Sequence, residues 1–96
     1  MSDEQLEDES LLCWNRDAAC RTIDGTAFVL LHSRMVSLNS VGSFVWENFS
    51  TGRTVGSVVD AVVEEFDVDH GTAQADTLKF IRTLLEKGML VQTDDQ

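Results

Sequence analysis

The sequence predicts a small α+β domain in which a three-stranded antiparallel sheet is followed by three helices. In the first half of the chain, short apolar runs alternate with tight-turn signals every few residues. From Asn39 onward, apolar residues recur at helical spacing, and the chain contains no proline. A chain of 96 residues, 43% of them hydrophobic, can build one modest core. We therefore expect a single domain.

The predicted strands are short apolar segments separated by turns, and they are residues 18–23, 26–32 and 35–38. Asp24-Gly25 is a strong signal for a two-residue type I′ hairpin, because both residue types tolerate a positive φ. We place a second tight turn at Ser33-Arg34. Residues 11–14 are apolar enough to contact the body as a short strand, and residues 90–91 predict a brief extended end.

The predicted helices share an apolar stripe at spacings of three and four, and they are residues 40–49, 54–66 and 72–87. Asn39 and Thr54 are N-cap candidates, because their side-chain oxygens can accept an orphan amide hydrogen. Gly88 supplies the left-handed residue that ends many helices. We expect Trp46 and Phe80, the largest aromatic residues of the first and third helices, to lie in the core.

Acidic residues are concentrated at the two ends of the chain. Seventeen acidic residues against seven basic ones give a net charge of −10, and five of the acidic residues lie within residues 1–9. We expect residues 1–10 to form a disordered acidic arm, residues 11–92 a single domain, and residues 93–96 an acidic tail. Such a charge opposes binding to nucleic acid and to anionic membranes.

The sequence also lacks targeting signals that would place the protein in or across a membrane. No apolar run approaches the roughly 20 residues that cross a bilayer, and the acidic start is unlike a signal peptide. We therefore expect a cytoplasmic protein without a membrane partner.

Signals for catalysis and for metal binding are sparse. His32 and His70 stand alone, and Cys13 and Cys20 have no histidine near them at the spacing of a zinc site. We expect two reduced thiols, with a disulfide hairpin as the alternative. No glycine-rich phosphate loop and no nucleophile–base pair is recognisable. The sequence therefore predicts no enzyme, no catalytic residue, no metal site and no cofactor.

The third predicted strand has an unprotected edge. Residues 35–38 carry no charge and no proline, which are the usual means of blocking an edge. A free edge beside a helix can receive an extended peptide as an added strand. The alternative is that the N-terminal segment, or another copy of the chain, covers this edge.

Four short motifs follow one another between Arg21 and Val91. They are Val29-Leu30-Leu31 with Val36-Ser37-Leu38-Asn39, then Gly42, Val45 and Trp46, then Gly52-x-Thr54-Val55, then Asp76, Phe80-Ile81, Leu84 and Gly88-x-Leu90. In order and spacing they resemble the PqqD-like family, named for a protein of pyrroloquinoline quinone biosynthesis. The resemblance covers about three quarters of the chain.

This resemblance implies a winged helix-turn-helix-like fold and a role in natural product biosynthesis. Members are RiPP recognition elements, which bind the leader of a ribosomally made precursor peptide and present it to a modifying enzyme, often a radical SAM enzyme. In the family the leader adds to the third strand, in a groove walled by the third helix. Carried onto this chain, the peptide-binding residues are Met35, Val36, Ser37 and Leu38 on the strand and Asp76, Lys79, Arg82 and Thr83 on the helix.

Two other functions remain as alternatives at this point. A winged-helix DNA-binding regulator is one, although a DNA-reading helix is normally basic and residues 54–66 contain no lysine or arginine. A purely structural or oligomerising domain is the other, and a homodimer would fit an unprotected strand edge.

Overall fold

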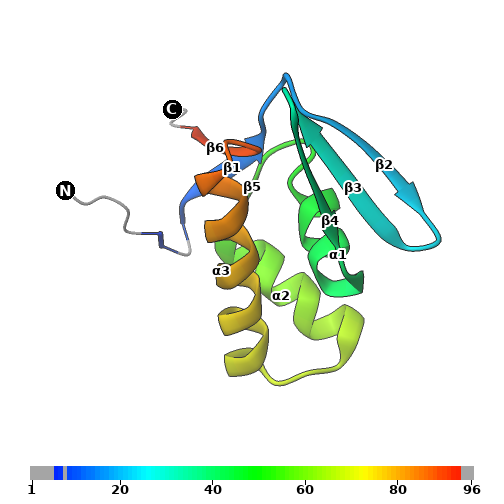
Figure 1. The fold of residues 1–96 in the computed structure, drawn as a ribbon. Coiled ribbons are helices and arrows are strands. Elements are labelled where there is room, and N and C mark those ends of the chain that lie inside the picture. The colour runs from blue at the N-terminus through cyan, green and yellow to red at the C-terminus, as the bar shows by residue number, and fades with distance from the viewer. Residues whose placement is uncertain (1–5, 8, 94–96) are drawn as a thin grey trace.

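The computed structural model describes residues 6–7 and 9–93. The predicted acidic arm and tail fall largely on residues 1–5, 8 and 94–96, which lie outside this description. Within the described part the element order is β1 (Leu11–Trp14), β2 (Ala19–Ile23), β3 (Thr26–Leu31), β4 (Arg34–Leu38), α1 (Ser40–Asn48), β5 (Arg53–Thr54), α2 (Val55–Phe66), α3 (His70–Glu86) and β6 (Leu90–Thr93) (Figure 1).

The predicted three-stranded antiparallel sheet is confirmed as β2-β3-β4. Asp24 and Gly25 have φ values of 53° and 82°, as a type I′ turn requires. The second turn lies one residue earlier than predicted, at His32-Ser33, so that β3 ends at Leu31 and β4 begins at Arg34. His32 supplies the positive φ there, at 57°, and histidine is a weak signal for such a conformation.

A second three-stranded sheet, β5-β1-β6, was not predicted as a unit. The expected short strand and the expected extended end both form, and they pair with each other from Leu11↔Thr93 to Trp14↔Leu90. The Trp14 ring stacks on Trp46 of α1 with centroids 4.6 Å apart, and its Nε1 donates a hydrogen bond to the Trp46 carbonyl at 2.7 Å. Strand β1 is therefore held to β6 by strand pairing and to α1 by the side chain of Trp14.

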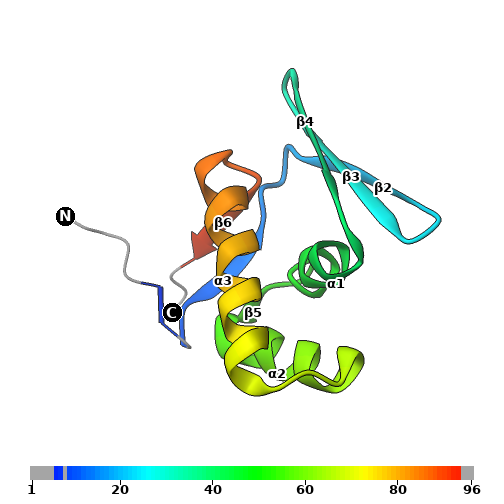
Figure 2. The same cartoon turned by 60° about the horizontal axis from the view of Figure 1, so that its bottom comes forward.

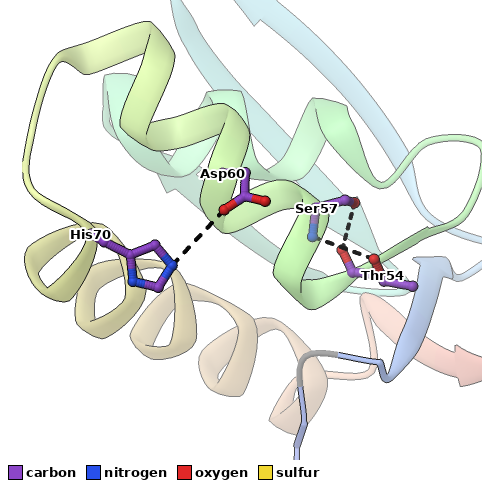
Figure 3. Close-up of polar contacts among 4 residues, drawn as sticks. All are labelled: Thr54, Ser57, Asp60 and His70. Carbon is purple, nitrogen blue, oxygen red and sulfur yellow. Dashed lines mark hydrogen bonds and ion pairs between the residues drawn. The ribbon is translucent and has the colours of Figure 1, made fainter.

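Side-chain caps start the first two helices where the sequence predicts. Asn39 accepts a hydrogen bond from the Gly42 amide at 2.8 Å. The Thr54 hydroxyl accepts one from the Ser57 amide at 3.3 Å, and the Ser57 hydroxyl donates to the Thr54 carbonyl (Figure 3). Each bond satisfies a backbone or side-chain group that would otherwise lack a partner at the first turn.

Helix α3 begins two residues earlier than predicted, because Asp69 and not a later residue is its N-cap. The Asp69 carboxylate accepts hydrogen bonds from the amide and the hydroxyl of Thr72. Beside this start, His70 lies 3.9 Å from Asp60 of α2 (Figure 3). Both side chains are largely exposed, so this ion pair contributes little stability. At the other end Gly88 has a φ of 76°, as expected for the residue that terminates the helix.

The core lies between the helices and the inner faces of the two sheets. Its largest fully buried side chains are Trp46, Phe49, Leu12, Ile81, Leu84, Met89 and Leu90. Trp46 is fully buried, as predicted, whereas Phe80 is only partly buried and flanks the core. A Cβ added to Gly42 would lie 2.6 Å from Cε1 of Phe80, so the missing side chain at Gly42 lets the Phe80 ring rest on α1.

Candidate functional site

Strand β4 forms one edge of the sheet β2-β3-β4, and its outer side has no strand partner among the described residues. The N-terminal strand β1, which could have covered this edge, pairs with β5 and β6 instead. Figure 1 shows β4 as the strand of its sheet on the side of α3. The predicted strand edge thus faces toward the side of the molecule that carries the predicted helix.

The hairpin geometry determines which backbone groups of β4 point away from β3. A two-residue turn closes on a hydrogen-bonded pair, here Leu31 and Arg34. Hydrogen-bonded and non-hydrogen-bonded pairs then alternate along an antiparallel ladder. Met35 and Ser37 are therefore the residues whose amide and carbonyl point to the free edge. Together they offer two donors and two acceptors to an added strand.

The side chains of β4 alternate between the two faces of the sheet. Leu38 is buried and Val36 is half-buried, on the face covered by α1. Met35 is 66% exposed on the opposite, outer face, and Ser37 is exposed beside it. A strand added at this edge would follow the same alternation, because directly opposite residues share a face.

A buried serine of α1 holds the end of β4 in place. The Ser43 hydroxyl accepts a hydrogen bond from the Ala27 amide at 2.7 Å and donates one to the Leu38 carbonyl at 3.0 Å. Ala27 and Leu38 are register partners on β3 and β4. One side chain therefore fixes both strands to α1, so that the free edge is carried on a rigid support.

All four predicted residues of α3 are exposed, but they do not lie on one stripe. At about 100° of rotation per residue, Asp76 and Thr83 lie within about 60° of Phe80. On the same basis Lys79 lies about 100° from Phe80, and Arg82 about 160° from it. Asp76 and Thr83 are accordingly nearest the side of α3 that meets α1, with Lys79 next to them.

Partly buried apolar side chains flank the core on the three elements next to this edge. Among them are Val36 of β4, Val41 of α1 and Phe80 of α3, each packed against the core without being fully covered. Only Val36 was singled out as a binding residue from the sequence. Phe80 differs from the other apolar residues of α3 because its ring lies against Gly42 of α1. These two residues are far apart in the chain, so no local sequence pattern predicts their contact.

Charges are distributed unevenly around the site. Helix α2 exposes only acidic charges, at Asp60, Glu64 and Glu65, whereas α3 exposes Lys79 and Arg82 together with Asp76 and Glu86. The acidic face of α2 is opposite in sign to the basic helix that a DNA reader needs. Near the start of α3, the hydrogen bond from the Thr72 hydroxyl, followed by that from its amide, lowers the pKa of Asp69 below its ordinary value.

The thiols and the acidic and histidine side chains are scattered over the described part of the chain. In residues 6–7 and 9–93 no three histidine, cysteine or acidic side chains cluster as a metal site would require. Cys13 is half-buried and Cys20 exposed, and both are free thiols. Over the same residues, no helix combines the length and the apolar character needed to span a bilayer.

Comparison with known proteins identifies the family. The family described as "Coenzyme PQQ synthesis protein D (PqqD)" matches residues 26–90, which is well over half of the chain. The chain therefore belongs to the PqqD family. A search of curated proteins finds no match.

Two solved structures share the fold. One is TbiB1 in complex with the TbiA(beta) leader peptide, with 27% sequence identity and a TM-score of 0.77, covering 86% of this chain and 99% of that one. The other is the solution NMR structure of the PqqD truncation of Methylobacterium extorquens PqqCD, described as a functional, stand-alone RiPP recognition element. It is 18% identical with a TM-score of 0.76, covers 91% of this chain and 95% of that one, and shows likeness of fold alone.

Proposed function

We propose that this protein is a non-catalytic adaptor that binds the leader of a ribosomally made precursor peptide and presents it to a modifying enzyme. The leader adds as a strand to β4, on the side facing α3. The structural likeness to TbiB1, which was solved with a leader peptide, supports this function. Family membership supports it independently.

One observation carries the proposal, namely that the outward backbone groups of Met35 and Ser37 at the edge of β4 have no strand partner among the described residues. Four backbone hydrogen bonds at about 0.5–1.5 kcal/mol each, together with apolar contacts to Val36 and Phe80, amount to micromolar or tighter binding. On α3, Asp76 and Thr83 lie nearest the side that meets α1, Lys79 adds a positive charge next to them, and Arg82 adds one from farther around the helix. No reacting group is needed for such a role.

The remaining partners follow from the same role. The enzyme that receives the leader is a radical SAM or other peptide-modifying enzyme, in pyrroloquinoline quinone biosynthesis or in a related peptide pathway. The two free thiols support a reducing, cytoplasmic setting. A homodimer would form by pairing of a free strand edge in each copy. If that edge were β4, dimer formation and leader binding would compete for the same backbone groups.

A proline substitution tests strand addition directly. The probe is a 15-residue peptide selected on the full chain from a randomised display library, called here the selected peptide. Ser37→Pro removes an amide that points to the free edge, and it leaves the ladder to β3 intact. We expect at least a tenfold loss of affinity by titration calorimetry, with a melting temperature close to that of the parent protein.

The matched control is Thr22→Pro, which removes an outward-pointing amide from the opposite edge of the same sheet. By the same alternation, the Thr22 amide points away from β3. We expect it to leave the affinity unchanged. Equal affinity of the parent and the Ser37→Pro protein would refute strand addition at β4. Repeating the titration with a precursor encoded by a short reading frame beside the gene then tests the leader assignment.

A further inference from the structure

The outer face of the sheet β2-β3-β4 is apolar and uncovered in the described part of the chain. Ile23, Leu30 and Met35 are 50%, 45% and 66% exposed. The pairing register places Ala19, Leu30 and Met35 in one row across the three strands on this face. A shallow hollow lies over the row, lined by Ala19, Cys20, Arg21, Phe28, Leu30 and Met35.

This face is distinct from the one that builds the core. Ala27, Val29 and Leu31, which alternate with Phe28 and Leu30 along β3, are buried beneath α1. None of the helices in residues 6–7 and 9–93 covers the outer face, which Figure 2 shows on the side of the sheet away from α1. Exposed apolar surface of this kind marks an interaction site more often than a scattered surface residue does.

Strand addition at β4 necessarily brings peptide side chains to this face. The side chains of an added strand alternate between the faces, and the residue paired with Met35 shares the face of Met35. Its Cβ would lie about 4.5–5.5 Å from that of Met35. The residue paired with Ser37 would also point outward, beside a small side chain that leaves Phe28 accessible. Only the residue between them, opposite Val36, would point to the inner face of the sheet, toward the helices.

We infer that the outer face binds the same leader peptide, and that the leader carries bulky apolar residues opposite both Met35 and Ser37. This inference rests on the proposed function and specifies its substrate class. The three leader residues opposite Met35, Val36 and Ser37 are then all apolar, so that the bound strand is apolar on both faces. A leader strand that was apolar only on its inner face would leave Met35 and the hollow exposed.

The chemistry of the hollow favours an apolar occupant over a charged one. Arg21 is the one charged residue that lines it, whereas the whole chain has a net charge of −10. An acidic side chain placed over Met35 and Leu30 would lose hydration against apolar side chains, because Arg21 lies on β2, at the other edge of the sheet. An aliphatic or aromatic side chain instead gains contact with Met35, whose flexible thioether adapts to different shapes.

Three threonine substitutions test the inference with the selected peptide. Met35→Thr and Leu30→Thr remove apolar surface from the hollow and keep a residue that favours strands. The matched control is Ile23→Thr, which lies on the same face but on β2, at the edge away from β4. We expect affinities about fivefold to tenfold weaker for the first two variants. For Ile23→Thr we expect a change below about twofold. Thermal melts verify that all three are folded.

A second measurement separates this inference from the function on which it rests. Amide exchange at positions 35 and 37 reports strand addition in every variant. If these amides become protected but Met35→Thr and Leu30→Thr bind as the parent does, the outer face is not part of the peptide site and the inference is overturned. If the amides stay unprotected in the parent complex, strand addition itself fails. Aspartate placed in the peptide opposite Met35 should weaken binding to the parent protein by at least fivefold.

Discussion

The two sheets of this protein have opposite surroundings. In β5-β1-β6 the inward residues Leu12 and Leu90 are almost completely buried, and the central strand joins distant parts of the chain. In β2-β3-β4 every residue of β2 is exposed, the outer face carries the exposed Leu30 and Met35, and β4 has no outer strand partner among the described residues. We call the first the closed sheet and the second the open sheet, because only the second exposes large apolar side chains across its outer face.

This difference indicates a division of labour between stability and binding. The closed sheet joins segments from the beginning, middle and end of the chain, and the Trp14–Trp46 stack and the Asn15–Gly88 hydrogen bond reinforce it. The open sheet is attached to the helices on one face only, where the buried Ser43 holds it. Substitutions in the first region should change folding, and substitutions in the second should change affinity.

The largest expected effect is on stability, at Trp46. Trp46→Ala removes a fully buried ring that stacks on Trp14, and should lower the free energy of unfolding by about 3–5 kcal/mol. Urea denaturation followed by circular dichroism measures the change. Leu30→Ala in the open sheet, where Leu30 is 45% exposed, is the comparison and should cost about 1 kcal/mol or less.

Trp46→Phe sharpens the same test. The Trp46 indole nitrogen is buried without a hydrogen-bond partner among the described residues, so phenylalanine keeps an aromatic ring and removes an unsatisfied donor. We expect a cost of roughly 1–2 kcal/mol, from the smaller ring alone. Similar costs for Trp46→Ala and Leu30→Ala would contradict the division between the two sheets.

The next effect is on affinity, at the cations of α3. Lys79→Glu and Arg82→Glu alter exposed side chains and should change stability by less than about 0.5 kcal/mol. Lys79→Glu should weaken binding of a peptide with an acidic flank about tenfold, and Arg82→Glu less, because Arg82 is farther around the helix from Phe80. Calorimetry at two salt concentrations tests this, since screening should reduce both effects. Unchanged affinity in both variants would remove this side of α3 from the site.

The smallest expected effect is a change in the pKa of Asp69, the N-cap of α3, at the end of this helix away from both sheets. Its pKa is lowered chiefly by the Thr72 hydroxyl. A carboxyl whose pKa is lower in the folded state contributes stability above its unfolded pKa of about 3.9 and loses that contribution as the pH falls through the folded value. Thr72→Val should therefore raise the Asp69 pKa, as followed by NMR titration of its carboxyl carbon. No shift would mean that the hydroxyl is not the main cause.

Much of the open sheet and of the helix ends could be predicted from the sequence. Asp24-Gly25, Asn39, Thr54 and Gly88 act through their own backbone and nearest neighbours, so their effect can be recognised without knowing the fold. The same holds for the edge at residues 35–38, because missing charge and missing proline are local properties.

The closed sheet could not be predicted as a unit, since its pairing joins residues far apart in the chain. β5 has two residues, too few to show any periodicity, and the Trp14–Trp46 stack brings together residues 32 positions apart. The partial burial of Phe80 could not be predicted either. The spacing of apolar residues shows which side of a helix faces the core, but not which of those residues lie at the edge of the buried surface. The contact of Phe80 with Gly42 determines its position.

Amide hydrogen exchange of the full chain, free and saturated with the selected peptide, tests strand addition at β4 most directly. The account predicts that the amides of Met35 and Ser37 exchange rapidly in the free protein and slowly in the complex. The Val36 amide, already bonded to β3, should be protected in both states and serves as the internal reference. Unchanged exchange at Met35 and Ser37, with new protection confined to α2, would contradict the account.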